Sequence, residues 1–125
     1  MAHPHRRLMK IQNGDIWMSN EPLTKLLKQK FPVKTSYALV QLAHKLTEQL
    51  EIINQVRLGL VEKYGEKGEG GQTIVKEDGP NWQKFTEEFD ELMSQEVEIE
   101  FEKVKLPDFE IEPTALMALE KFVEV

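Results

Sequence analysis

The longest hydrophobic pattern in the chain predicts one helix over residues 35–64. No proline interrupts this stretch, and apolar side chains return at intervals of three, four and seven residues. At about 1.5 Å per residue the helix would be roughly 45 Å long, which exceeds the diameter of a compact domain of this size. The apolar positions are Leu39, Leu42, Leu46, Leu50, Ile53, Leu60 and Tyr64.

This helix is also where we expect self-association. Further apolar residues, including Ile52 and Val56, widen the stripe toward two faces. A long helix with so much apolar surface needs more partner surface than the short remaining elements supply. The candidate oligomer interface follows the heptad-like stripe, with Arg57 at the position where an apolar residue is expected. It consists of Leu46, Leu50, Ile53, Arg57 and Leu60.

Two short elements are predicted before the long helix. An Asn-Gly pair between short apolar runs is typical of a type I′ turn. The sequence therefore predicts a hairpin of residues 9–12 and 15–18, with Asn13-Gly14 as its turn. Asn20 is a suitable N-cap and Pro22 suits a first helical turn, so a short helix is expected over residues 20–30.

After the long helix, large apolar residues predict a second helix over residues 81–94. Their spacing of three, four and three places them on one face, which we expect to pack against the long helix across a glycine-rich loop. These residues are Trp82, Phe85, Phe89 and Leu92. A short strand is expected over 73–75, and a final helix begins near Pro113 and carries Leu119, Phe122 and Val123.

Strict alternation of apolar residues and glutamates predicts a strand over residues 97–106, with a break in its phase after Phe101. One face of this strand is apolar and is expected to be buried. The other is an exposed row of carboxylates and is a candidate acidic interaction face, made of Glu96, Glu98, Glu100 and Glu102.

Together these elements predict a mainly helical α+β fold. We expect a long antiparallel helical hairpin with a small antiparallel sheet at one end, made from the N-terminal hairpin and the strand over 97–106. Residues 9–125 are expected to form one domain, preceded by a disordered extension of residues 1–8. The expected apolar anchors are Trp17, Leu46, Leu50, Ile53, Trp82, Phe85, Phe89, Ile99, Phe101, Leu119 and Phe122.

Composition narrows the class of protein. The 125 residues are 40% hydrophobic and 30% charged, as is typical of a globular domain. The chain has no cysteine and no apolar run long enough to span a membrane, so we expect neither disulfides nor a membrane anchor. The net charge of −6 is uneven: residues 1–65 hold 10 basic against 5 acidic side chains, and residues 66–125 hold 6 against 17. An acidic chain disfavours direct binding of nucleic acid.

The sequence offers no catalytic constellation and no metal or cofactor site. No serine lies in a Gly-x-Ser-x-Gly turn. His44 with Glu48 one turn later could supply two zinc ligands, but a third is missing. Glu87 and Glu91 could chelate a hard cation, but no histidine or asparagine beside them completes a site. We therefore expect a protein that is not an enzyme.

Several segments, in order from Met9 onward, resemble a family of small uncharacterised proteins encoded by phages and prophages of Gram-positive bacteria. The segments are MKIQNG, PVKTSYAL, LAHKL, VEKYGE, FTEEFDELM, EVEIEFEKVKL and IEPTALMALEKF. The resemblance implies a phage-encoded accessory protein, in the cytoplasm of a bacterial host or in the virion. That family has no assigned activity, so the resemblance implies no site residues.

Two main functional hypotheses follow, beside a third interpretation as a metal-dependent enzyme built around His44, Glu48 and the Glu87–Glu91 face. The first is a non-enzymatic phage accessory protein that acts through assembly or protein–protein interaction, as a homo-oligomer formed through the long helix, with a phage or host protein as a further partner. The alternative is an acidic inhibitor of a host nucleic-acid-binding protein, which would present carboxylates of the glutamate-rich C-terminal half where phosphates would lie.

Overall fold

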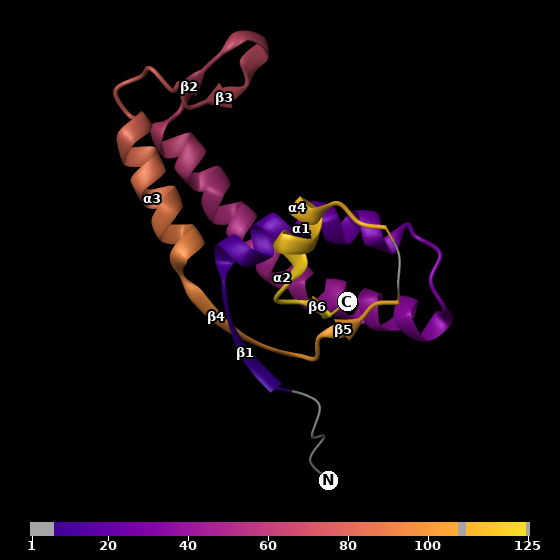
Figure 1. Ribbon diagram of the computed structural model, residues 1–125. Coiled ribbons are helices and arrows are strands. Elements are labelled where there is room, and N and C mark those ends of the chain that lie inside the picture. Colours follow the sequence, from indigo (N-terminus) through magenta and orange to yellow (C-terminus); the bar gives the residue numbers. More distant parts are fainter. Residues whose placement is uncertain (1–6, 108–109, 125) are drawn as a thin grey trace.

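The computed structural model describes residues 7–107 and 110–124 and has a mainly helical α+β fold (Figure 1). Of the predicted extension 1–8, residues 1–6 lie outside the described ranges, and the first strand already begins at Arg7. In chain order the elements are β1 (Arg7–Gln12), α1 (Asn13–Leu27), α2 (Val33–Tyr64), β2 (Glu66–Lys67), a 3-10 turn η1 (Glu69–Gly71), β3 (Thr73–Ile74), α3 (Trp82–Ser94), β4 (Glu96–Phe101), β5 (Val104–Lys105), α4 (Pro113–Leu119) and β6 (Val123–Glu124).

The hairpin predicted at Asn13-Gly14 is wrong. Neither residue has the positive φ that a type I′ turn requires. Instead Asn13 begins α1, and the backbone N–H of Gln12 donates to the Asp15 carboxylate at 3.1 Å, which caps the first turn. The partner of β1 is β4, which is distant in sequence and pairs with it antiparallel.

The helix predicted over residues 20–30 exists, but its predicted start is too late. The helix α1 begins seven residues earlier and contains Pro22 in its interior, although proline removes a backbone hydrogen bond there. Side chains at intervals of three, four and three are buried along one face, and their burial outweighs this loss. The buried residues of this face are Ile16, Ser19, Leu23 and Leu26.

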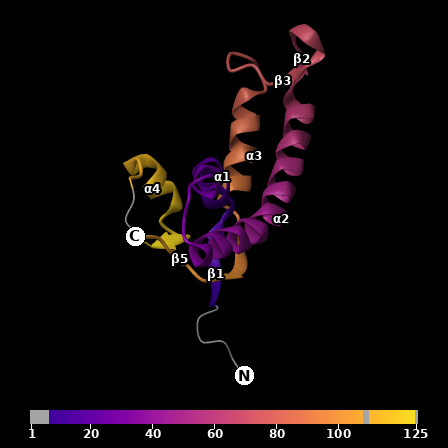
Figure 2. The ribbon, with the colours of Figure 1, turned by 90° about the vertical axis from the view of Figure 1, so that its right-hand side faces the viewer.

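The predicted helices over 35–64 and 81–94 are confirmed as α2 and α3. The first part of α2 lies against α1, and its last part lies against α3, which returns alongside it (Figures 1 and 2). Gly65 follows the last residue of α2, and its backbone N–H closes the helix by donating to the Val61 carbonyl oxygen at 2.7 Å.

Three separate two-stranded sheets complete the described residues. The strands β1 and β4 form the longest ribbon, β2 and β3 form a small hairpin at the far end of α2 and α3, and β5 pairs with β6 in parallel. The predicted strand over 97–106 is thus broken into β4 and β5, where the sequence phase slips. The final helix ends at Leu119, earlier than predicted, because Val123 pairs with Val104 in a strand.

The hydrophobic core lies where α1, the first part of α2, the β1–β4 ribbon and the C-terminal segment meet. The rings of Phe101 and Phe122 lie 5.5 Å apart in this core. Five predicted anchors are fully buried: Leu46, Ile53, Phe101, Leu119 and Phe122. The others are half-buried: Trp17, Leu50, Trp82, Phe85, Phe89 and Ile99. Among residues 7–107 and 110–124, no helix is long and apolar enough to cross a membrane.

Candidate functional site

The last part of α2 and α3 extend away from the core as an arm, which we define as residues 54–91 (Figure 2). No side chain of the arm is fully buried. By contrast, α2 buries Leu39, Leu42, Leu46 and Ile53 before the arm begins, and α3 buries Leu92 after it. The arm is therefore a pair of helices without a complete covering layer, and α1 reaches only its base, where Arg57 lies over the Trp17 ring.

A row of aromatic side chains follows one face of α3 in the arm. The ring centroids of Trp82 and Phe85 lie 5.8 Å apart, and those of Phe85 and Phe89 lie 5.9 Å apart. All three side chains are only half-buried. Part of each aromatic side chain therefore remains in water.

One ion pair joins the two helices of the arm. The Lys63 Nζ lies 3.6 Å from Glu88 Oε1 and 5.1 Å from the centre of the Tyr64 ring. Its contact with Tyr64, and next the negative charge of Glu88, raise the pKa of Lys63 above its ordinary value. The second carboxylate oxygen of Glu88 is buried and accepts no hydrogen bond from the described residues.

An exposed apolar stripe runs along α2 into the arm. Ile52 is 53% exposed and Val56 is 45% exposed, and Gly59 follows them at the spacing that keeps all three on one helix face. Beyond its chain neighbours and the adjacent backbone of α2, a Cβ atom added to Gly59 would meet no atom within 4 Å. The stripe of Ile52, Val56 and Gly59 therefore faces open space.

The predicted oligomer interface lies on a different face of α2. Leu46 and Ile53 are buried against the rest of this chain, so their side chains offer no surface to a second copy, while Leu50 and Leu60 are half-buried. The reason is that α1 and the core already cover this face. The periodicity identifies an apolar face correctly but does not say which neighbour covers it.

Arg57, the polar member of the predicted interface, contacts other residues of its own chain. Its Nε and Nη2 donate to Asn54 Oδ1 at 3.1 and 2.9 Å. The guanidinium carbon lies 5.6 Å from the centre of the Trp17 ring, a cation–π contact between α2 and α1.

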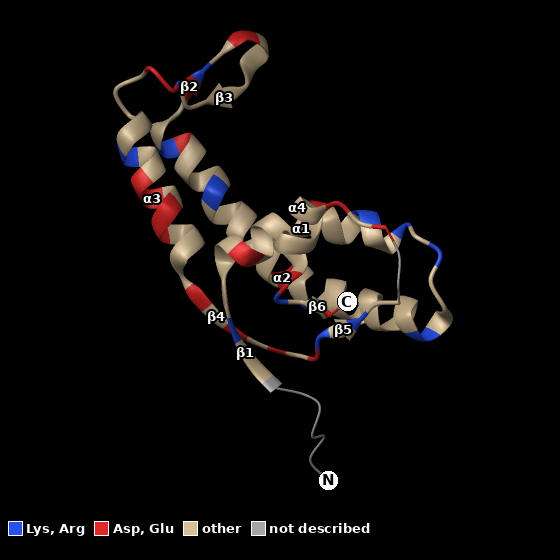
Figure 3. Cartoon of the chain, in the orientation of Figure 1, with Lys and Arg blue, Asp and Glu red and all other residues tan. Residues whose placement is uncertain are grey.

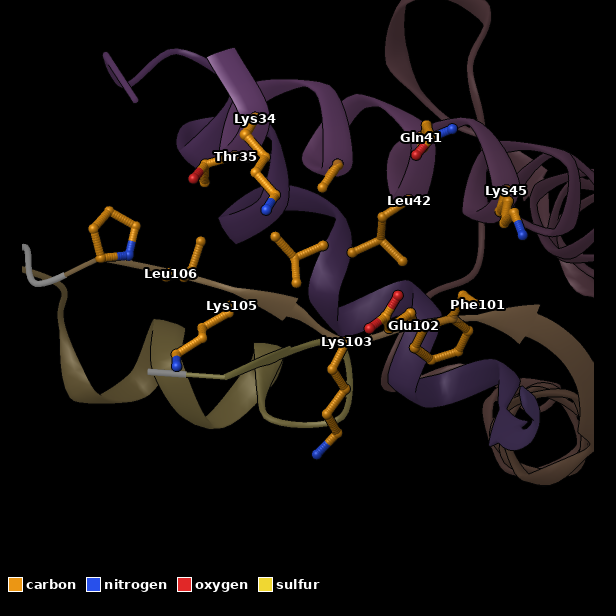
Figure 4. Close-up of a pocket in the computed structure, with 13 residues that line it drawn as sticks. Lys34, Thr35, Gln41, Leu42, Lys45, Phe101, Glu102, Lys103, Lys105 and Leu106 are labelled. Atoms are coloured by element: carbon orange, nitrogen blue, oxygen red, sulfur yellow. The ribbon is translucent and has the colours of Figure 1, made fainter. Parts of the chain in front are cut away.

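Three of the four predicted acidic residues share an exposed face of β4. Glu96, Glu98 and Glu100 are exposed, and alternate residues turn inward. Glu102 follows the end of the strand and lines a groove beside α2 instead (Figure 4). Lys10 on β1 stands opposite Glu98 in the ribbon and interrupts the negative charge. Figure 3 shows that carboxylates also follow α3, so the acidic surface continues from β4 onto the arm.

The other candidate residues do not assemble into a site. His44 and Glu48 are both exposed on α2, and Glu87 and Glu91 are exposed on α3. Within residues 7–107 and 110–124, no three His, Cys, Asp or Glu side chains are placed to hold one metal ion. The sequence pattern did not predict that Ile52, Val56 and Gly59 form one exposed surface. The glycine inside a helical pattern was the feature that could have indicated it.

Comparison with known proteins assigns no function to this geometry. No protein-family model, no curated protein and no solved structure matches the chain.

Proposed function

We propose that this chain is a non-enzymatic assembly protein that associates with a second copy of itself through the arm. The observation that carries the proposal is the exposed stripe of Ile52, Val56 and Gly59, which runs along α2 into an arm with no fully buried side chain. The setting is the one that the sequence resemblance implies, an accessory protein of a phage or prophage that meets phage or host proteins in a bacterial cell.

Burial of apolar surface supplies the driving force. Fully burying a valine or isoleucine side chain contributes about 1.5–3 kcal/mol relative to leaving it exposed. Two arms packed together would form a four-helix arrangement, which gives each helix pair the covering layer that it lacks alone. A twofold axis would use the same stripe on both copies, so one patch would serve both sides of the interface.

The presence of Gly59 in the stripe favours a helix of the second copy as the element that packs on it. A glycine inside a helix costs about 1 kcal/mol relative to alanine. Since nothing beyond its chain neighbours and the adjacent backbone of α2 lies within 4 Å of the site of its missing Cβ, packing against other parts of the chain does not require a glycine. A second helix could approach the backbone of α2 closely at this point.

The charge distribution is compatible with this packing. On α3 the exposed carboxylates of Glu87, Asp90 and Glu91 lie on the face opposite the aromatic row. A second copy that packs on the α2 side of the arm would leave them in water, where their mutual repulsion is screened.

Solution mass tests the proposal. We would measure light scattering at two protein concentrations and two salt concentrations, for the parent chain, Val56→Glu and Gln55→Glu. The two variants add the same charge to adjacent exposed positions, but only Val56 belongs to the stripe. We expect the parent chain to form an oligomer that persists at high salt. The substitution Val56→Glu should dissociate this oligomer, and Gln55→Glu should leave it intact. A monomeric parent chain, or equal effects of both variants, would overturn the proposal.

The alternative is an acidic inhibitor of a host nucleic-acid-binding protein. The acidic surface that runs from Glu96, Glu98 and Glu100 onto α3 favours it. An inhibitor of this kind would capture a basic protein in a complex that dissociates as salt is raised. A monomeric parent chain with such salt-sensitive binding would favour this alternative over assembly.

A further inference from the structure

A groove of about 590 Å³ lies between the first turns of α2 and the extended segment 101–107 (Figure 4). Its apolar lining includes Ala38 and Leu42 from α2 and Val104 and Leu106 from the opposite wall. The volume lies within the range of about 300–1,000 Å³ that is usual for sites that bury a ligand.

Basic side chains surround this apolar lining. Four lysines and one acidic residue, Glu102, line the groove. In Figure 4 the side chain of Lys34 points from α2 toward segment 101–107. The lysines of the opposite wall extend outward and are exposed. The four are Lys34, Lys45, Lys103 and Lys105.

This concentration of positive charge runs against the composition of the chain. Residues 66–125 hold 17 acidic and 6 basic side chains, and two of those six, Lys103 and Lys105, lie at this groove. The N-terminus of α2 adds to the positive potential, because Lys34 and Thr35 of its first turn line the groove and this turn contains no acidic residue.

One lysine is held in place by the fold. Lys45 Nζ donates to the main-chain carbonyl oxygen of Glu100, which joins α2 to the end of β4. Lys34, Lys103 and Lys105 are exposed and are free to turn toward an occupant.

An occupant of this groove needs carboxylates and apolar groups together. Its apolar groups would contact Ala38, Pro107 and the aliphatic stems of the lysines, because Leu42, Val104 and Leu106 are themselves buried under this lining. Its carboxylates would lie within reach of the lysine ammonium groups. Nucleic acid fits less well, because the lining has no arginine and its one aromatic residue, Phe101, is buried and cannot stack on a base.

We propose that this groove binds an acidic peptide segment of a partner protein, whose apolar side chains lie between α2 and residues 104–106. The proposal does not depend on self-association, because the groove is lined by the first part of α2 and not by the arm.

A selection from a library of random peptides tests the proposal on the full chain. We expect the enriched peptides to combine Asp and Glu with large apolar residues. Lys34→Glu combined with Lys105→Glu, one change on each wall, should weaken their binding by at least about tenfold. The matched control combines Lys28→Glu with Lys30→Glu, which makes the same charge change at exposed lysines that do not line the groove.

A second variant tests the apolar lining without changing charge. Ala38→Phe should fill part of the groove and weaken the same peptides, while circular dichroism shows that the helices are retained. Enriched peptides without an acidic excess, equal loss in the Lys28/Lys30 control, or displacement of the peptide by single-stranded DNA at equal charge would overturn the proposal. Val56→Glu should bind the peptides as the parent chain does, whatever its oligomeric state.

Discussion

The buried side-chain amide of Asn13 donates a hydrogen bond of 2.9 Å to the main-chain carbonyl oxygen of Leu92. The amide oxygen of Asn13 accepts a hydrogen bond of 3.1 Å from Gln49 Nε2, and its backbone N–H donates to the Gln95 carbonyl oxygen at 2.9 Å. One polar residue therefore ties the start of α1 to the middle of α2 and to the end of α3. Its burial costs little because its hydrogen bonds are made.

Replacing Asn13 should destabilise the fold in a pH-dependent way. We expect Asn13→Ala to lower the free energy of unfolding by about 1–3 kcal/mol, because it removes two hydrogen bonds in a buried setting. Asn13→Asp should cost more at neutral pH, because a carboxylate cannot donate to the Leu92 carbonyl oxygen and lies buried beside it. Urea denaturation measures both losses.

Lowering the pH should restore part of the stability that Asn13→Asp loses at neutral pH. Burial raises the folded-state pKa of the new carboxyl at position 13 above its unfolded value, so the folded state binds the proton more tightly. The relative stability of Asn13→Asp should therefore recover as pH falls toward mildly acidic values, whereas that of Asn13→Ala should not. A constant difference between the two variants across this range would contradict the hydrogen-bond direction.

Neighbouring isoleucines on α2 should separate folding from association. Ile53 is fully buried and Ile52 is 53% exposed. Ile53→Asp should unfold the chain, since an unpaired charge in the core costs several kcal/mol, on the order of the whole stability of a small domain. Ile52→Asp should keep the circular dichroism spectrum and lose the oligomer. If Ile52→Asp unfolds the chain as Ile53→Asp does, the stripe is not a free surface.

The substitution Gly59→Ala should stabilise the single chain and weaken its association with a second copy. Gly59→Ala should stabilise the single chain by up to about 1 kcal/mol through helix propensity, because its Cβ would enter open space. The same methyl group should hold a second helix further away and weaken the oligomer. Thermal denaturation at low concentration and sedimentation at high concentration measure the two effects. Stronger association of the variant would argue against close helix packing at this glycine.

Replacing His44 should have little effect on the stability or the solution mass of the protein. Its side chain is exposed on α2, and no described side chain joins it and Glu48 as a third metal ligand. We expect His44→Ala to change the free energy of unfolding by no more than about 0.5 kcal/mol and to leave the solution mass unchanged. Loss of an activity in a His44→Ala protein with an intact fold would contradict the proposal that the chain is not an enzyme.

Local hydrophobic periodicity is enough to predict the long helices and the main strand. Leu39, Leu42 and Leu46 recur at helical spacing, and Val97, Ile99 and Phe101 alternate with glutamates. Such periodicities record which side of an element is buried, and this is a local property of the chain. The exposed positions of Glu96, Glu98 and Glu100 were predictable for the same reason.

The N-terminal strand, the exposed face of α2 and the groove depend on contacts between segments that are distant in sequence. Asn13-Gly14 favours a turn locally, but pairing of β1 with β4 and the burial of Asn13 against α3 outweigh that preference. Leu46 and Ile52 both belong to apolar faces of one helix, and the position of α1 and the core decides that Leu46 is covered and Ile52 is not. The groove joins residues of α2 to residues 101–107. A single pattern along the chain carries no information about contacts between such distant segments.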